Sequence, residues 1–368
     1  MNKKIIVKAE EIKKFWNILC RNRGIFSVFF KNNRAIFTSS GHSVLVSYSS
    51  PCEGPQETRC FKFFPFRIKG ETGDLNFEFY GQSHNVTGNA VFQQNQDAFT
   101  LFPQDQPIFG DISDEGVDAP VDMPKTLKRL MKVRINTQDV FYENIYFVKL
   151  PDRSGGVAIT DGNSLMWASF PVIPHEGEIS VPILSMSSLP GGGLFSIISM
   201  EGMKRLCYQC GDWLLSSRIS TPLMSTGFDA SGLFSLPSPI SAKIRINEGD
   251  FKNMFDMLDG LPLGQRKGKV PYFFIKTTTL NGVKTIKTFL KFKNRFNSCE
   301  PIGVVSLLKT EWITNNYYEE FFFGVRDMKN ALSAKFTEFC VSKVDPRVTM
   351  IKSENNGFHF ISCCSDPQ

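Results

Sequence analysis

The segment Met123–Arg134, MPKTLKRLMKVR, carries five basic side chains and no acidic one. A helical wheel separates its apolar and basic residues onto two faces, with Met123, Leu127, Leu130 and Met131 opposite Lys125, Lys128, Arg129 and Lys132. Such a helix can bury its apolar face against a sheet and still offer cations to phosphate groups, which bind without regard to base sequence. The chemistry that these residues support is therefore sequence-independent binding of duplex DNA.

Weaker versions of this pattern occur in three other predicted helices. The first carries Lys13, Lys14 and Arg21, the third carries Lys252, and a late helix carries Arg326 and Lys329. Acidic residues share the third helix with Lys252, so its basic character is weaker. A solvated helix face explains any one of these helices equally well. Their recurrence along the chain favours contact with DNA.

An internal repeat organises these helices. Ile36–Val44 aligns with Val157–Leu165 at an offset of 121 residues, and both segments are typical of two strands joined by a tight turn at glycine. Amphipathic helices near residues 12–19, 127–134 and 251–258 recur at a similar interval. The sequence thus predicts an α+β chain of three related domains, 1–118, 119–238 and 239–368. The alternative is a coincidence, because strand–helix openings are common.

A family resemblance accompanies this repeat. Residues 157–169 read VAITDGNSLMWAS and resemble the T-D-G-H-R-L turn in the middle domain of the bacterial DNA polymerase sliding clamp, the beta subunit. Ala98–Pro103 resembles the strand that closes the first clamp domain, and Arg326–Phe336 resembles the last helix of the third. The resemblance implies antiparallel sheets outside, helices inside, and a homodimeric ring around duplex DNA.

The resemblance also implies partners and a partner site. A sliding clamp, or processivity factor, has no catalysis and no cofactor of its own, and it tethers DNA polymerase and binds the clamp loader through short peptides. The residues that match the peptide groove of the family are Thr160, Gly162, Asn163, Leu165 and, as a weaker fit, Pro222. An ordinary β-turn with Gly162 in the left-handed position explains the same residues equally well.

Several positions depart from the family pattern. Asn163 and Ser164 replace the His and Arg of the turn, and Pro190–Gly193 would cut short the second helix of the middle domain. Residues 365–368 read SDPQ where family members have a hydrophobic tail, so that half of the groove is expected to be absent or rebuilt. A divergent clamp, such as a phage-encoded one, fits these departures better than a housekeeping clamp.

Signatures of catalysis and of metal binding are weak. Gly264–Lys269 resembles a phosphate-binding loop but is one residue short between the glycines, and Val270 stands where a magnesium-binding Ser or Thr belongs. Neither G-x-S-x-G nor H-E-x-x-H occurs, and the four His lie far apart in sequence. The sequence therefore favours a protein without catalytic residues or a metal site over a nucleic-acid enzyme.

Composition sets the remaining bounds. The formal net charge of +6 permits a polyanionic partner without requiring one, and no apolar run approaches the ~18 residues that span a bilayer. The nine cysteines are interpreted as reduced strand residues. These features predict no membrane association and a cytoplasmic location, which is the host cytoplasm for a phage protein. A viral decoy or structural protein that has kept the clamp fold is the alternative function.

Overall fold

The structure is a computed structural model, and its contacts group the chain into two compact units. Unit 1 comprises Met1–Leu127, Asn144–Phe147 and Pro171–Ser225, and unit 2 comprises Lys128–Glu143, Val148–Phe170 and Thr226–Gln368. Within these units the structure describes residues 3–19, 25–40, 44–54, 60–62, 70–80, 83–88, 93–99, 116–133, 144–150, 152–161, 164–173, 179–200, 203–219, 240–246, 252–253, 256, 271–280, 283–292, 300–301, 308–312, 320–345 and 348–365.

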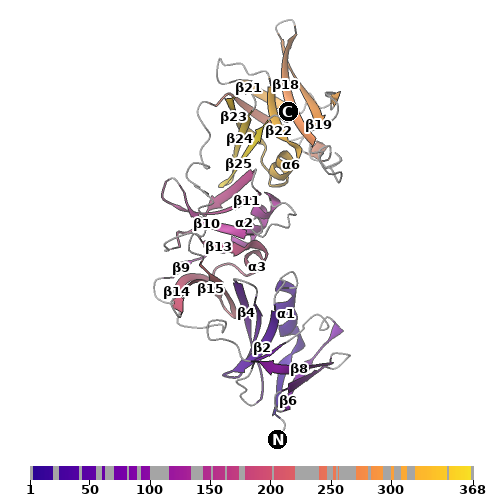
Figure 1. Cartoon of the computed structure of the whole chain (residues 1–368), viewed down its shortest axis with the longest axis vertical. Coiled ribbons are helices and arrows are strands. Elements are labelled where there is room, and N and C mark those ends of the chain that lie inside the picture. Colours follow the sequence, from indigo (N-terminus) through magenta and orange to yellow (C-terminus); the bar gives the residue numbers. More distant parts are fainter. Residues whose placement is uncertain are drawn as a thin grey trace. The chain divides into compact units, whose positions relative to one another are not determined.

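Unit 1 is built on a long antiparallel sheet (Figure 1). Its strands follow the order β1-β6-β7-β8-β5-β2-β3-β4-β16-β15-β14-β9. Their bounds are β1 Lys3–Lys8, β2 Ile25–Lys31, β3 Arg34–Ser40, β4 Val44–Pro51, β5 Cys60–Lys62, β6 Asp74–Tyr80, β7 Ser83–Thr87, β8 Gln93–Phe99, β9 Val117–Asp118, β14 Leu194–Met200, β15 Met203–Cys210 and β16 Trp213–Arg218. In the same unit, residues 144–147 of β10 (Asn144–Lys149) pair with β13 (Ile179–Pro182).

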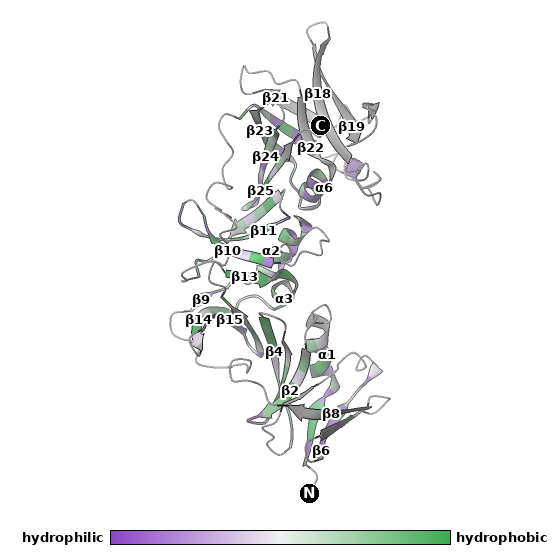
Figure 2. Cartoon of the chain, viewed as in Figure 1, coloured by the Kyte–Doolittle hydropathy of each residue, from purple (hydrophilic) through white to green (hydrophobic). Residues whose placement is uncertain are grey.

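Helix α1 (Ala9–Leu19) packs on one face of this sheet. Its fully buried Phe15 contacts the rings of Phe26, Phe37 and Trp213, with centroid distances of 6.3, 5.8 and 6.4 Å. Burial of one such side chain contributes about 2–3 kcal/mol. The amphipathic spacing that begins at Ile12 therefore correctly predicts which face of α1 is buried. Figure 2 shows that β4 of this sheet is also strongly hydrophobic.

Unit 2 contains two antiparallel sheets. One follows the order β11-β12-β25-β24-β23-β17-β21, and the other follows β20-β19-β18-β22. Their bounds are β11 Gly155–Thr160, β12 Ser164–Ser169, β17 Ala242–Ile246, β18 Pro271–Leu280, β19 Val283–Phe292, β20 Glu300–Pro301, β21 Leu308–Trp312, β22 Glu320–Gly324, β23 Glu338–Asp345, β24 Val348–Asn355 and β25 Phe358–Ser365. Helix α6 (Val325–Ser333) follows β22 directly.

The remaining described helices are α2, which carries the predicted basic face, and α3, which precedes Pro190–Gly193. Helix α2 (Met123–Leu130) continues into the 3-10 turn η3 (Met131–Val133), and its Met123, Leu127 and Leu130 are buried as the wheel predicts. Helix α3 (Ile183–Ser187) has five residues, which agrees with the expectation that Pro190–Gly193 would cut it short. The fold is thus α+β, with antiparallel sheets and few helices, as predicted.

The internal repeat appears as two equivalent strand junctions, one in each unit. In unit 1 the hairpin β3–β4 adds β16 beside β4, and in unit 2 the hairpin β11–β12 adds β25 beside β12. The pair Ser40↔Leu45 of the first hairpin corresponds to Thr160↔Leu165 of the second, a shift of 120 residues at both positions. The strand pairing therefore gives a repeat offset of 120 residues, one less than the offset of 121 in the sequence alignment. The three domain boundaries stay a prediction.

Candidate functional site

The basic face of α2 is exposed where lysines carry it. Lys125 and Lys128 of α2 and Lys132 of η3 are exposed, while the apolar residues of the helix are buried. Successive lysines lie three and four residues apart, so they follow one helix face. Within the described part of the chain, none of the three has an ion-pair partner. Their side chains are exposed to solvent along one face of the helix.

Arg129 behaves differently from its lysine neighbours on α2. Its Nε donates a hydrogen bond to the carbonyl of Ala334 (3.0 Å), and its Nη2 donates to the carbonyl of Asn355 (3.3 Å). The guanidinium carbon lies 4.0 Å from the ring centroid of Phe358 and 5.6 Å from that of Phe336. Partial burial lowers the pKa of Arg129. Cation–π contacts of this kind contribute about 1–2 kcal/mol. Arg129, which the sequence predicts to bind DNA, therefore has its hydrogen-bond and ring partners within unit 2.

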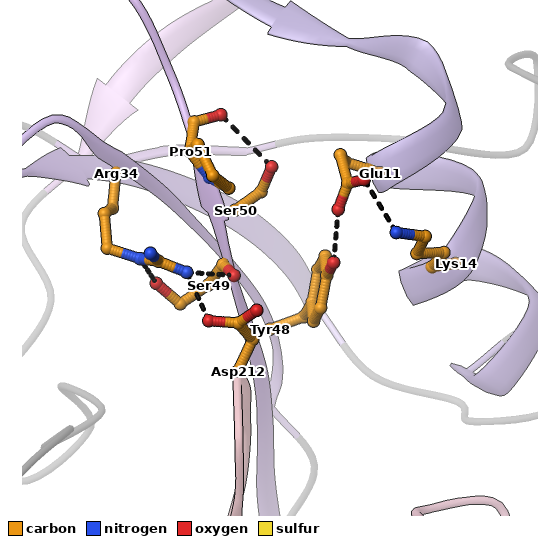
Figure 3. Close-up of polar contacts among 8 residues, drawn as sticks. All are labelled: Glu11, Lys14, Arg34, Tyr48, Ser49, Ser50, Pro51 and Asp212. Atoms are coloured by element: carbon orange, nitrogen blue, oxygen red, sulfur yellow. Dashed lines mark hydrogen bonds and ion pairs between the residues drawn. The ribbon is translucent and has the colours of Figure 1, made fainter.

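The two lysines of α1, Lys13 and Lys14, each have a partner within unit 1. Lys13 Nζ donates to the carbonyl of Glu71. Lys14 Nζ forms an ion pair with Glu11 Oε1 at 2.7 Å, although 59% of its side chain is exposed (Figure 3). The hydrogen bond from Lys14 to Glu11 raises the pKa of Lys14. Glu11 also accepts a hydrogen bond from the Tyr48 hydroxyl. The first helix therefore offers a weaker cationic face than α2.

Figure 3 shows a second polar cluster beside this pair, at the junction of β4 and β16. Arg34 contacts the Ser49 side chain, donates to the Ser49 carbonyl at 2.8 Å and pairs with Asp212. Asp212 precedes β16, and its carbonyl accepts a hydrogen bond from the Ser49 amide (2.9 Å). Burial and the hydrogen bond with Glu11 raise the pKa of Tyr48 well above its usual range. These contacts fix the junction.

The other predicted DNA-binding residues lie in unit 2 or outside the described residues. Lys252 is helical and exposed, and the exposed Asp256 lies one turn further along the chain. Arg326 is exposed on the first turn of α6, whereas Lys329 is half-buried. Arg21 lies outside the described residues. The lysines of α2 and η3 therefore form the clearest basic face.

The predicted partner groove centres on the turn between β11 and β12. Asp161 closes this turn, because its Oδ1 accepts from the Ser164 amide at 2.7 Å and its own amide donates to the Ser164 carbonyl at 3.1 Å. Thr160 Oγ1 donates to the same carbonyl (2.8 Å). Gly162, Asn163 and Pro222 lie outside the described residues. The Asp161 carboxylate and the Thr160 hydroxyl thus hold the two ends of the turn together.

Leu165 follows this turn and is packed into a cluster. It is 4% exposed and belongs to a hydrophobic cluster with Ala158, Trp167 and Ile361 of β25. The register pairs Leu165 directly with Ile361. Val148, Leu150 and Met350 are partly buried and pack against the cluster. Sequence reasoning missed Ile361 because its proximity to Leu165 arises from a strand pairing across 196 residues of chain.

Asp327 of α6 is a buried carboxylate that contacts strand β25. Asp327 in the first turn of α6 accepts a hydrogen bond from Ser362 Oγ at 3.0 Å. Burial raises the pKa of Asp327 to about 6, and the nearby negative charge of Asp161 adds to the rise. Gly324 precedes the helix, and a Cβ there would lie 2.6 Å from Asp327 Oδ2, so a larger residue would displace this carboxylate. No sequence signal identified Asp327, since helices often carry an acid in the first turn.

Other kinds of site receive little support from the described residues. Among them, no group of three or more His, Cys, Asp or Glu side chains could hold a metal ion. The loop Gly264–Lys269 lies outside the described residues. None of the described helices is both long enough and apolar enough to cross a bilayer. Cys52, Cys207, Cys210, Cys340 and Cys363 are free thiols.

No protein-family profile matches the chain, and no curated protein matches it in sequence. Solved structures do match. The DNA polymerase sliding clamp of Bacillus subtilis is 15% identical, with a TM-score of 0.68 and 100% of each chain covered.

Two further matches have ligands in their crystals. The sliding clamp of Bartonella birtlesii bound to griselimycin is 10% identical with a TM-score of 0.68, and 99% of each chain is covered. The Helicobacter pylori beta clamp bound to a DNA ligase peptide is 11% identical with a TM-score of 0.64, covering 98% of this chain and 99% of that one. Along its full length, this chain has the fold of the bacterial DNA polymerase sliding clamps.

Proposed function

We propose that this protein is a sliding clamp, a processivity factor that encircles duplex DNA and tethers DNA polymerase. The observation that carries the proposal is the match of the whole chain to whole clamp structures, in both directions of coverage. The exposed lysines of α2 and η3 support it, because they offer phosphate contacts without base readout. In this proposal the chain has three clamp domains with boundaries near residues 118 and 238, and it acts in the cytoplasm without catalysis or a cofactor.

The proposed mechanism is topological. Non-specific phosphate binding has a Kd of roughly 10⁻⁴ to 10⁻⁶ M at physiological salt. Such binding allows sliding but is too weak to keep a polymerase on its template. In a closed homodimer, escape from circular DNA requires ring opening instead of the breaking of ionic contacts. Salt that abolishes the ionic contacts would therefore leave the ring on the DNA.

Ligation trapping tests this mechanism directly. The protein is mixed with linear duplex DNA, the ends are ligated, and the circles are washed at about 1 M salt, where exposed ionic contacts are screened. We expect the protein to stay on ligated circles and to leave when a restriction enzyme linearises them. Sedimentation should give a species of twice 41.6 kDa. A strict monomer that leaves circles and linear DNA alike would contradict the ring and favour a clamp-fold decoy.

The proposed partner groove lies along the hydrophobic cluster of Leu165 and Ile361. An extended peptide from a polymerase or a clamp loader would place aliphatic and aromatic side chains against the partly buried rim. The resemblance to the clamp family adds Thr160, Gly162, Asn163 and Pro222 to the residues of the proposed groove. The support is indirect: the Helicobacter pylori clamp was solved with a DNA ligase peptide, and the Bartonella birtlesii clamp with griselimycin.

Griselimycin provides a defined probe for this groove. A carboxylate in the rim, introduced as Met350→Asp, should weaken griselimycin binding at least 10-fold, because a ligand that packs against the apolar cluster would have to desolvate this charge. Lys243→Asp, on an exposed position of β17, is the control and should leave the affinity unchanged. Isothermal titration measures both. Equal affinity in Met350→Asp and in the unsubstituted protein would place the probe elsewhere.

A further inference from the structure

Arg129 connects two separate segments of unit 2. Its first acceptor, Ala334, is the C-cap residue that follows α6. Its second acceptor, Asn355, is the last residue of β24 and begins the turn into β25. The Asn355 side chain also donates to the carbonyl of Lys335. The guanidinium and the amide together fasten the turn before β25 to the end of α6.

The turn that Arg129 contacts has a demanding backbone. Asn356 and Gly357 both have positive φ, 52° and 73°, which is the conformation of a tight hairpin turn. The next residue, Phe358, is the first of β25, and its ring lies under the guanidinium. Arg129 therefore contacts the chain on both sides of the turn.

Strand β25 carries the apolar side of the proposed partner groove. Phe358 pairs with Ala168 of β12, and the same register places Ile361 opposite Leu165. A shift at the first residue of β25 would pass along the ladder to this pair, because strand register is set as a unit. The ring that Arg129 contacts and the side chain of Ile361 thus belong to the same strand, β25.

The geometry of these contacts requires an arginine. A planar guanidinium can donate from Nε and Nη2 to two different carbonyls while its face covers an aromatic ring. A lysine ammonium on a flexible stem is a single point charge and reproduces only part of this arrangement. The lysines on either side of Arg129 need only present a positive charge to act in the proposed phosphate contacts, whereas the contacts of Arg129 need the planar guanidinium.

We propose that Arg129 is a positioning residue for the partner groove: it anchors the start of β25 and thereby holds Ile361 against Leu165. The groove is that of the proposed function, on which this inference rests. Helix α2 then has two roles, since its lysines face phosphate groups and its arginine holds a strand. Loss of Arg129 affects partner binding and leaves the ionic contacts with DNA in place.

The test separates these two roles with paired variants. Arg129→Lys should weaken griselimycin binding by about 10-fold and leave the salt slope of DNA binding unchanged. Lys128→Ala should lower that slope by about 0.9, the value for one lost phosphate contact. Arg245→Lys is the matched control, because Arg245 is 70% exposed and pairs with Glu338 on the surface. A slope lowered by Arg129→Lys, with unchanged griselimycin affinity, would overturn the proposal.

Hydrogen exchange gives a readout that does not depend on the groove's function. Arg129→Lys and Arg129→Ala should speed exchange of the first amides of β25 at least 10-fold, while amides of β17 keep their rates. Failure of the unsubstituted protein to bind griselimycin would count against the proposed groove alone. Unchanged exchange in β25 in both variants would overturn the role of Arg129, whatever the probe does.

Discussion

Replacing Lys125, Lys128 and Lys132 together by glutamate should weaken binding to duplex DNA about 100-fold at 0.15 M salt. Each lysine is exposed on one face of α2 and η3, and each lost phosphate contact removes about 0.9 from the slope of log affinity against log salt. The slope should therefore fall by about 2.7. Fluorescence anisotropy with a labelled duplex, measured from 0.05 to 0.3 M salt, gives both quantities. Arg129 stays unchanged, because its contacts are internal to unit 2.

A second triple variant controls for net charge. Lys4, Lys31 and Lys243 are also exposed, but they lie on strands β1, β2 and β17. Their replacement by glutamate changes the formal charge of +6 by the same amount. We expect this variant to lose little affinity and to keep the salt slope. Equal losses in the two variants would mean that overall charge, and not the face of α2, governs binding to DNA.

The sequence predicted the elements better than it predicted their partners. The amphipathic spacing identified α1 and α2, and the same pattern correctly placed Phe15, Leu127 and Leu130 in the interior. The two segments that are typical of strands joined by a tight turn, Ile36–Val44 and Val157–Leu165, correspond to the hairpins β3–β4 and β11–β12. Each of these features is local, because it depends on residues within a few positions of one another along the chain.

The sequence could not show which basic residues face solvent and which bind internal acceptors. Lys128 and Arg129 are neighbours and read alike on a helical wheel, but only the lysine is exposed. The partners of Arg129 are Ala334 and Asn355, more than 200 residues further along the chain. Lys14 similarly meets Glu11 within its own helix. Whether a basic residue faces solvent or an internal acceptor depends on tertiary contacts, which helix periodicity does not report.

The carboxylate of Asp327 should make the stability of the protein depend on pH in an unusual direction. Its pKa is raised to about 6 by burial and then by the charge of Asp161, whereas an unfolded aspartate has a pKa near 3.8. The folded state therefore binds the proton more tightly than the unfolded state does. The stabilisation from this proton is complete below the unfolded pKa and is lost as pH rises towards about 6.

Asp327→Asn tests this dependence, because an amide keeps the acceptor for Ser362 Oγ and cannot ionise. The variant should gain about 2 kcal/mol in unfolding free energy relative to the unsubstituted protein between pH 4.5 and pH 7.5. Urea unfolding at both pH values measures the difference. Asp161→Asn should give part of the same gain, since it removes the repelling charge and keeps the oxygen that accepts from the Ser164 amide.

Asp256→Asn is the matched control, because this carboxylate is exposed and should gain nothing. A difference between Asp327→Asn and the unsubstituted protein that stays constant from pH 4.5 to 7.5 would mean that Asp327 titrates alike in the folded and unfolded states. If the predicted change is found, ionisation of Asp327 costs stability at neutral pH. That cost would fall on the contact between α6 and β25, the strand that also carries Ile361.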